Sequence, residues 1–189
     1  KTVNKADLLK DKLQNVDNIS AISYFIEQVV MIMHNDKWAT AKMKGVEDAY
    51  KFICLSDSVI YKGSNSLWKD NMPLAIIGRG IQNQIQVHSN SIYNNISVYA
   101  LLRDKKLSVN NKSAFKPISI NVGGVFSINK EYDNEYFIVP IEIAKELLDY
   151  KDDVSGIDIA VKDKSKTKLT KQNIIDIVWD SFTVKTKYE

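Results

Sequence analysis

The chain is poor in the residues that build disulfides and metal sites. Its 189 residues include one cysteine, Cys54, and two histidines, His34 and His88. A single cysteine excludes an internal disulfide, a zinc site built on thiolates and a Cys-x-x-Cys redox pair. Neither histidine has a histidine or a carboxylate four residues further on, so the sequence predicts no helical metal site. We expect both histidines to lie on the surface and Cys54 to be a packed, inert thiol.

The chain also lacks the motifs of the common enzyme classes. Gly78 and Gly80 could open a dinucleotide-binding loop, but the third glycine of that motif falls on Asn83. There is no Gly-x-Ser-x-Gly nucleophile motif, and Ser113 precedes Lys116 by a catalytic spacing only within a polar segment. We therefore predict no enzymatic activity and no cofactor or metal in this domain, and we interpret Gly78 as a tight turn between a strand and a helix.

The net charge of the chain is small, and its apolar runs are short. Lysine and arginine number 26 against 23 aspartates and glutamates, a net charge of +3 that is too dispersed to indicate a nucleic-acid-binding surface. The longest apolar stretches, such as residues 29–33, are far shorter than the roughly 20 residues that cross a bilayer as a helix. With 44% hydrophobic residues, the chain can bury a core, and we expect it to be soluble as given.

Helical and alternating periodicities predict a mixture of helices and strands. In the first third, they favour an amphipathic helix at about residues 4–16, a long hairpin with strands at 19–33 and 39–43, a short helix near 46–54 and a loop at 62–66. The remaining elements follow the same rules. They are strands near 74–77, 92–102, 118–122 and 157–161, helices at 78–86 and from Pro140, a helix capped by Thr170, and a last strand holding Phe182 and Val184.

The predicted fold class is α+β. A mixed α/β unit would be built from both ends of the chain, residues 1–58 and 132–189, and a mainly β insertion would occupy residues 59–131. Because the first helix and the last segment would belong to the same unit, we expect the two ends of the chain to lie near each other.

Several ordered segments resemble the extracytoplasmic domain of ABC permeases of the LolC and LolE lipoprotein-release type, within the MacB and FtsX superfamily. The resemblance rests on residues 16–21, 43–46, 75–81, 126–141, 144–148 and 154–159. Each segment alone is unspecific, since aliphatic strands and glycine turns are common, but together they cover nearly the whole chain in the right order.

The resemblance implies a location and partners. In that family the domain lies on the periplasmic side of the inner membrane, between the first and second transmembrane helices, and it consists of an α/β Porter subdomain and a β-rich Sabre insertion. ATP is hydrolysed by a separate cytoplasmic ATPase, and a partner permease subunit completes the complex. A MacB-like efflux component and an FtsX-like regulatory or scaffolding domain are the alternative interpretations.

The resemblance also implies a candidate partner-binding loop. In one lipoprotein-release permease a Sabre loop binds the periplasmic lipoprotein carrier, and residues 103–116 occupy the corresponding position here. The candidate contact residues in and beside this loop are Leu101, Arg103, Lys105, Lys106, Leu107, Val109 and Phe115. The prolines associated with the family's loop are missing, and only Pro117 lies nearby. A solvated hairpin without a partner is the alternative.

Overall fold

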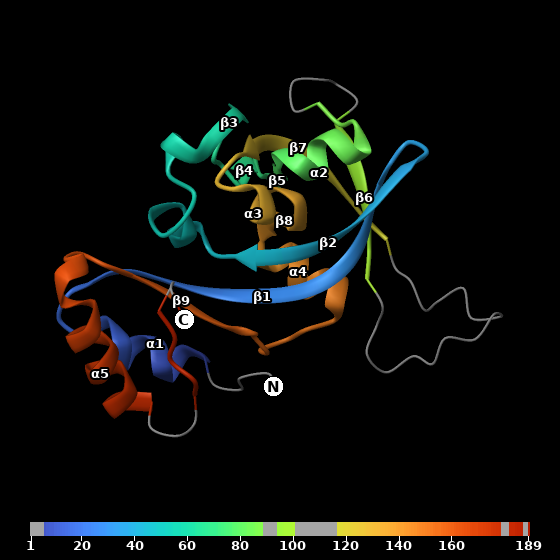
Figure 1. The fold of residues 1–189 in the computed structure, drawn as a ribbon. Helices are drawn as coiled ribbons and strands as arrows, with labels where there is room; N and C mark the ends of the chain where they lie inside the picture. The colour runs from blue at the N-terminus through green and yellow to red at the C-terminus, as the bar shows by residue number, and fades with distance from the viewer. Residues whose placement is uncertain (1–5, 89–93, 101–116, 179–181, 187–188) are drawn as a thin grey trace.

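The computed structural model describes residues 6–88, 94–100, 117–178, 182–186 and 189, and for residues 6–8 only the backbone (Figure 1). The helices are α1 (Ala6–Gln14), α2 (Arg79–Ile85), α3 (Lys130–Glu135), α4 (Ile141–Leu148) and α5 (Thr167–Val178), with short 3-10 turns η1 (Asp48–Phe52), η2 (Asp57–Val59) and η4 (Lys164–Lys166). The strands are β1 (Ile19–His34), β2 (Lys37–Val46), β3 (Ile60–Gly63), β4 (Trp68–Lys69), β5 (Met72–Gly78), β6 (Asn95–Tyr99), β7 (Ile118–Phe126), β8 (Tyr136–Pro140) and β9 (Gly156–Val161). Within this part of the chain, no helix is long and apolar enough to cross a membrane.

The sheet closes on itself. Its hydrogen-bonded order runs β7, β6, β1, β2, β8, β5 and back to β7, because β5 pairs with both β8 and β7. The β2–β8 and β5–β7 pairs are parallel and the other pairs in the ring are antiparallel. Strand β3 extends the sheet from β7, and β4 pairs with β5.

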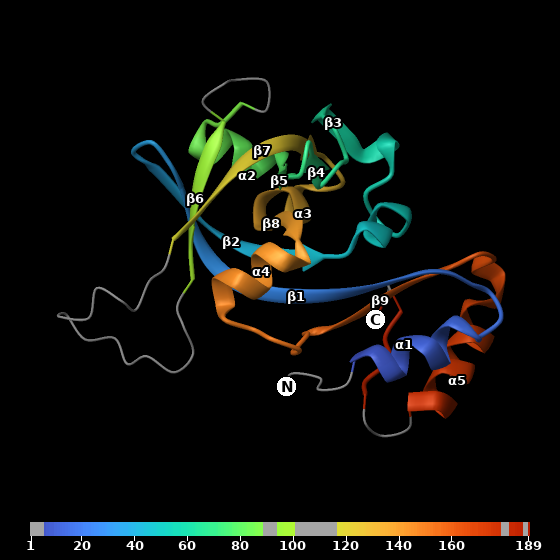
Figure 2. The same ribbon diagram turned by 180° about the vertical axis from the view of Figure 1, so that it is seen from behind.

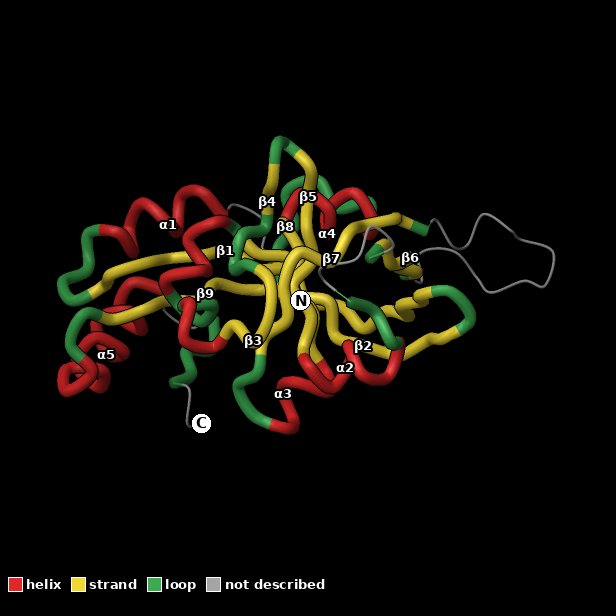
Figure 3. Tube along the Cα trace, turned by 90° about the horizontal axis from the view of Figure 1, so that it is seen from above, coloured by secondary structure: helices red, strands yellow, loops and turns green. Residues whose placement is uncertain are grey.

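Strand β1 is the longest element and connects the two ends of the molecule. Its 16 residues span roughly 50 Å at the usual rise of a strand. It pairs with β9 through residues 19–25, with β2 through residues 25–34 and with β6 through residues 31–33. Seen from three sides, α1 and α5 lie together at the start of β1, and β6 lies near its other end (Figures 1, 2 and 3).

Alternating residues of the strands fill two cores on opposite faces of the sheet. The larger core holds Val30 and Ile32 of β1, their neighbours on β2, β5, β6, β7 and β8, and the apolar side chains of α2 and α4. The second core holds Val46, Ile76, Phe126 and Ile138, covered by Tyr50, Leu55 and Leu67. A third cluster, made by α1, α5, β1 and β9, contains Leu13, Ile22, Ile174 and Val178.

Most of the predicted elements are present. The long hairpin, the amphipathic first helix, the turn at Gly78 and the helix after Pro140 all form, and the overall class is α+β as expected. Gly78 must be glycine because a Cβ there would lie 2.2 Å from the backbone oxygen of Asp133. The first and last helices pack against each other, as the expected proximity of the chain ends requires. Cys54 is half-buried against the second core, and His88 is exposed.

Several local predictions were wrong. Thr170 does not cap a helix: α5 begins at Thr167, and the buried Thr170 hydroxyl donates a hydrogen bond to the Lys166 carbonyl one turn earlier. Phe182 and Val184 form no strand and instead pack as half-buried side chains against the third cluster. His34 is buried, and because a carbonyl oxygen can only accept, its Nδ1–H must donate the 2.8 Å bond to the Asn95 oxygen of β6.

Two further elements differ from the prediction. Helix α3 was not expected, because its six residues are too few to show a period; the Asn129 side chain caps it by accepting from the Tyr132 N–H. Residues 62–66, expected as a loop, begin within β3. The division at residues 59 and 131 stays a prediction, but β3, β5, β6 and β7 from that segment share one sheet with β1, β2 and β8.

The contact between β2 and α4 is close enough to test the packing. A Cβ on Gly45 would lie 2.3 Å from the Ala144 Cβ, so Gly45→Ala should lower the free energy of unfolding by about 1–3 kcal/mol. Adding Ala144→Gly should restore most of that loss, less about 1 kcal/mol for glycine within a helix. Urea unfolding of the two single variants and the double variant measures the coupling; strictly additive effects would contradict this contact.

Candidate functional site

The predicted partner-binding residues lie outside the described residues. This applies to Leu101, Arg103, Lys105, Lys106, Leu107, Val109 and Phe115. The structure does place the two ends of that segment, since Ala100 follows β6 and Pro117 precedes β7. These strands are antiparallel neighbours, with Val98 opposite Ile118. The segment therefore starts and ends at one side of the closed sheet, where Tyr99 of β6 lies opposite Met31 of β1.

Beside these strand ends, β1 and β2 present large apolar side chains to solvent. Val29, Met31 and Trp38 are 54%, 40% and 62% exposed. They lie on one face, because Met31 and Met33 of β1 oppose Thr40 and Trp38 of β2, while Val30 and Ile32 point into the core. An exposed apolar cluster of this kind is a candidate contact surface. The sequence shows it only as a continuous apolar run, which is equally typical of a strand buried on both faces.

The other end of β1 carries the α1–α5 base, by which we mean α1, α5, β9 and residues 19–24 of β1. Leu13 of α1 and Ile174 and Val178 of α5 are buried together with Ile22 of β1. Asn18, at the turn before β1, donates to the Asp163 carbonyl and to the Thr170 hydroxyl. The two ends of the chain are thus held on the same strand.

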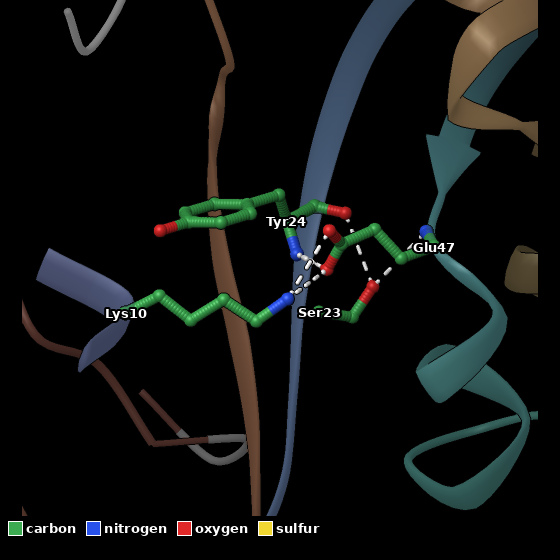
Figure 4. Close-up of polar contacts among 4 residues, drawn as sticks. All are labelled: Lys10, Ser23, Tyr24 and Glu47. Atoms are coloured by element: carbon green, nitrogen blue, oxygen red, sulfur yellow. Dashed lines mark hydrogen bonds and ion pairs between the residues drawn. The ribbon is translucent and has the colours of Figure 1, made fainter. Parts of the chain in front are cut away.

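A polar network joins this base to the end of β2 (Figure 4). Glu47 follows β2, and its carboxylate accepts from Lys10 Nζ of α1 at 3.0 and 3.2 Å and from the Tyr24 backbone N–H at 3.0 Å. The Ser23 hydroxyl, fully buried, accepts from the Glu47 N–H at 3.3 Å and donates to the Tyr24 carbonyl at 3.1 Å. Lys10 Nζ also lies 5.2 Å from the centre of the Tyr24 ring.

The network extends the pairing of β1 beyond the end of β2. Regular pairing stops at Phe25 opposite Val46, so the next N–H on this edge of β1, that of Tyr24, needs another acceptor. The Glu47 side chain supplies it, and the same carboxylate binds α1 through Lys10. Glu47 is therefore a single residue through which α1, β1 and β2 are connected.

A buried lysine makes a second connection, between β2 and β9 across β1. Lys44 Nζ lies 2.7 Å from the Asp158 carboxylate and 4.3 Å and 5.0 Å from the ring centres of Phe25 and Tyr50. Lys44 is only 8% exposed, so its charge depends on this carboxylate and on the faces of the two rings. The ion pair between Lys44 and Asp158 thus connects β9 to β2.

Three tyrosines continue this cluster toward α3 and β8. The Tyr50 and Tyr132 hydroxyls are 3.4 Å apart, and the Tyr132 ring stacks on Tyr136 with a centroid distance of 4.2 Å. Burial raises the pKa of Tyr50 and of Tyr132 well above the ordinary tyrosine value, and it also raises the pKa of Tyr136. At the exposed edge, Lys42 Nζ contacts the Glu135 carboxylate at 2.6 Å, a hydrogen bond that raises the pKa of Lys42.

The lysines of these clusters form ion pairs. Lys10, Lys42 and Lys44 are all paired with carboxylates. In the described ranges, no group of three histidine, cysteine, aspartate or glutamate side chains could hold a metal ion. What the arrangement can do is keep α1, α5 and the closed sheet in a fixed relation. The roles of Glu47, Lys44 and Tyr50 leave no local signal in the sequence, because their partners Lys10, Asp158 and Tyr132 are far away in the chain.

Sequence comparison finds no matching family model and no matching curated protein. Comparison of the structure with solved structures does find similar folds. The extracellular domain of the noncanonic ABC-type transporter YknZ from Gram-positive bacteria aligns with a TM-score of 0.60 at 12% identity, over 93% of this chain and 83% of that one. The periplasmic region of MacB from Actinobacillus actinomycetemcomitans aligns with a TM-score of 0.61 at 10% identity, over 93% and 74% of the two chains.

This chain shares the fold of those two domains. The likeness extends over nearly the whole chain. It agrees with the α+β class expected from the resemblance to ABC permease domains.

The Glu47 network predicts an order of stability losses. Glu47→Ala leaves the Tyr24 N–H without its acceptor and should lower the free energy of unfolding by about 1–3 kcal/mol. Lys10→Ala removes only a half-exposed ion pair and should cost less than about 1 kcal/mol, and Glu47→Gln, which keeps an acceptor oxygen, should lie between them. Urea unfolding measures the three losses. A larger loss for Lys10→Ala than for Glu47→Ala would contradict the role given to the Tyr24 bond.

The tyrosine cluster predicts a loss of stability in alkali. A tyrosine whose pKa is raised on folding contributes stability that is complete below the unfolded pKa of about 10 and is lost as the pH rises above it. The free energy of unfolding should therefore fall above about pH 10, and it should fall less steeply in Tyr50→Phe. Denaturant unfolding at several pH values, with phenolate absorbance as a second readout, tests this. Ionisation of all nine tyrosines before unfolding would be the opposite result.

Proposed function

We propose that this chain is the extracytoplasmic domain of an ABC transporter permease and that it passes conformational changes between the membrane and a partner outside the cytoplasm. The observation that supports this most is the common fold with the YknZ extracellular domain and the MacB periplasmic region over 93% of the chain. In this proposal the parent protein is in the inner membrane, ATP is hydrolysed by a cytoplasmic ATPase, and a second permease subunit completes the complex.

The geometry suits such a role. The first and last helices, α1 and α5, pack together in the base, which in this proposal is the end of the domain nearer the membrane. Strand β1 runs from this base to the β6 and β7 ends, where the predicted partner-binding segment begins. Glu47 and Lys44 bind the base to the sheet. A displacement of the base would therefore be carried to the far end without any catalytic group.

We further propose lipoprotein release as the transport process, on the basis of the ordered resemblance to LolC and LolE. Export of the MacB type is the second candidate, supported by the MacB fold. The two differ in the expected partner, which is a periplasmic lipoprotein carrier in the first and an adaptor protein in the second.

Labelling of the full-length protein in intact cells tests the proposed location. Lys51 is exposed, so a Lys51→Cys variant in a Cys54→Ser background should react with a membrane-impermeant maleimide without lysis. The Cys54→Ser protein without the new cysteine is the matched control. Reaction of Lys51→Cys only after lysis would contradict an extracytoplasmic domain.

The candidate loop leads to a binding prediction. Phe115→Ala or Leu107→Ala should weaken binding of the carrier or adaptor by more than about 1 kcal/mol, because apolar anchors supply most of the affinity. Lys105→Ala or Lys106→Ala should mainly slow association and change its dependence on salt. Binding kinetics, with circular dichroism to check the fold, would separate these effects. Unchanged affinity after deletion of residues 104–114 would mean that the partner binds elsewhere.

A further inference from the structure

An open surface pocket of about 400 Å³, called the α2–β3 cavity below, is lined by residues of α2 and β3, away from the base and from the Glu47 network. One wall is a polar stripe of α2 formed by Arg79, Gln82 and Asn83, and Gln86, the residue that caps the end of this helix, continues it. The opposite face of α2 carries Ile81 and Ile85, both fully buried in the larger core. The other wall is formed by Tyr61 and Lys62 of β3, and His88 completes the lining.

The charged side chains that line this cavity, Arg79 and Lys62, are both positive. Arg79 lies with its guanidinium carbon 4.3 Å from the centre of the Tyr61 ring, and Lys62 Nζ lies 5.5 Å from the same centre. No acidic residue lines the cavity among the residues that the structure describes, and no carboxylate there pairs with Arg79 or Lys62. Two cations are thus held beside one ring without a counter-charge, an arrangement that an anion would stabilise.

The donors are suited to a phosphate group. The Arg79 guanidinium carbon lies over the Tyr61 ring, and a guanidinium carries N–H groups that can bind two phosphate oxygens at once. The three amide side chains of Gln82, Asn83 and Gln86 can each donate and accept, as hydroxyl groups require. Gln82 is only 6% exposed, so its position is fixed by packing.

We infer that this cavity binds a phosphate ester carried on a polyhydroxylated ring. Arg79 and Lys62 bind the phosphate, and the α2 amides bind the hydroxyl groups. The site is independent of the proposed transport role, and the same chemistry occurs in soluble sugar phosphates and in the headgroups of inositol lipids.

Calorimetry on the 189-residue chain tests the site with inositol 1-phosphate, inorganic phosphate and myo-inositol as probes. We expect inositol 1-phosphate to bind more tightly than inorganic phosphate, myo-inositol not to bind, and affinity to fall as salt is raised. Arg79→Gln and Lys62→Gln should each weaken binding of inositol 1-phosphate at least about tenfold, with Arg79→Lys retaining part of it. Lys51→Gln is the matched control, because Lys51 is also an exposed lysine beside an aromatic ring, and it should leave binding unchanged.

A second arm identifies the source of the ligand. Flotation with phosphatidylcholine vesicles, with or without phosphatidylinositol, supports a lipid headgroup if the chain binds only the vesicles that contain phosphatidylinositol, and a soluble ester if it binds neither kind while inositol 1-phosphate still binds. Thermal unfolding checks that Arg79→Gln and Lys62→Gln remain folded. The proposal is overturned if neither inositol 1-phosphate nor the phosphatidylinositol vesicles bind, or if Lys51→Gln loses as much affinity as Arg79→Gln.

Discussion

Continuous hydrogen bonding along β1 is the constraint on which the rest of the structure depends. From Ile19 to His34, this strand is paired on at least one edge except at Ser20, where the register shifts, first with β9 and then with β2 and β6. Its alternate side chains enter the larger core, while Ile22 and the start of the strand belong to the α1–α5 cluster. A strand of 16 residues therefore connects the two ends of the molecule directly.

Charged side chains strengthen this connection where regular pairing changes partner. Near Phe25 the strand exchanges β9 for β2, and at this position Glu47 supplies the acceptor for the Tyr24 N–H while Lys44 joins β2 to Asp158 of β9. Buried ion pairs are poor sources of net stability compared with apolar packing, but they fix orientation, since each charge is costly to leave without its partner. We interpret both contacts as fixing the angle between the base and the closed sheet.

The elements that could be predicted from the sequence are those set by residues close together in the chain. The hairpin and the helices after Gly78 and Pro140 follow from alternation, helical spacing and turn chemistry within a few residues. The closure of the sheet through β5 and β7 did not follow, because pairing between residues as far apart as Leu74 and Asn121 leaves no local period. The same reason hid Glu47 and Lys44, whose partners Lys10 and Asp158 are distant in the chain. The capping role predicted for Thr170 was wrong because a hydroxyl that can cap a helix can also, inside a helix, donate to a carbonyl of the preceding turn.

The central claim is that the α1–α5 base and the far end of β1 move as one body. The distance between spin labels at Asp36→Cys, in the β1–β2 turn, and Leu169→Cys, on the exposed side of α5, measures this directly in a Cys54→Ser background. It should be recorded for the 189-residue chain and for the full-length protein with and without ATP. The account predicts one narrow distance distribution that is the same in all three samples. A broad distribution, or a distance that changes when ATP is added, would contradict it.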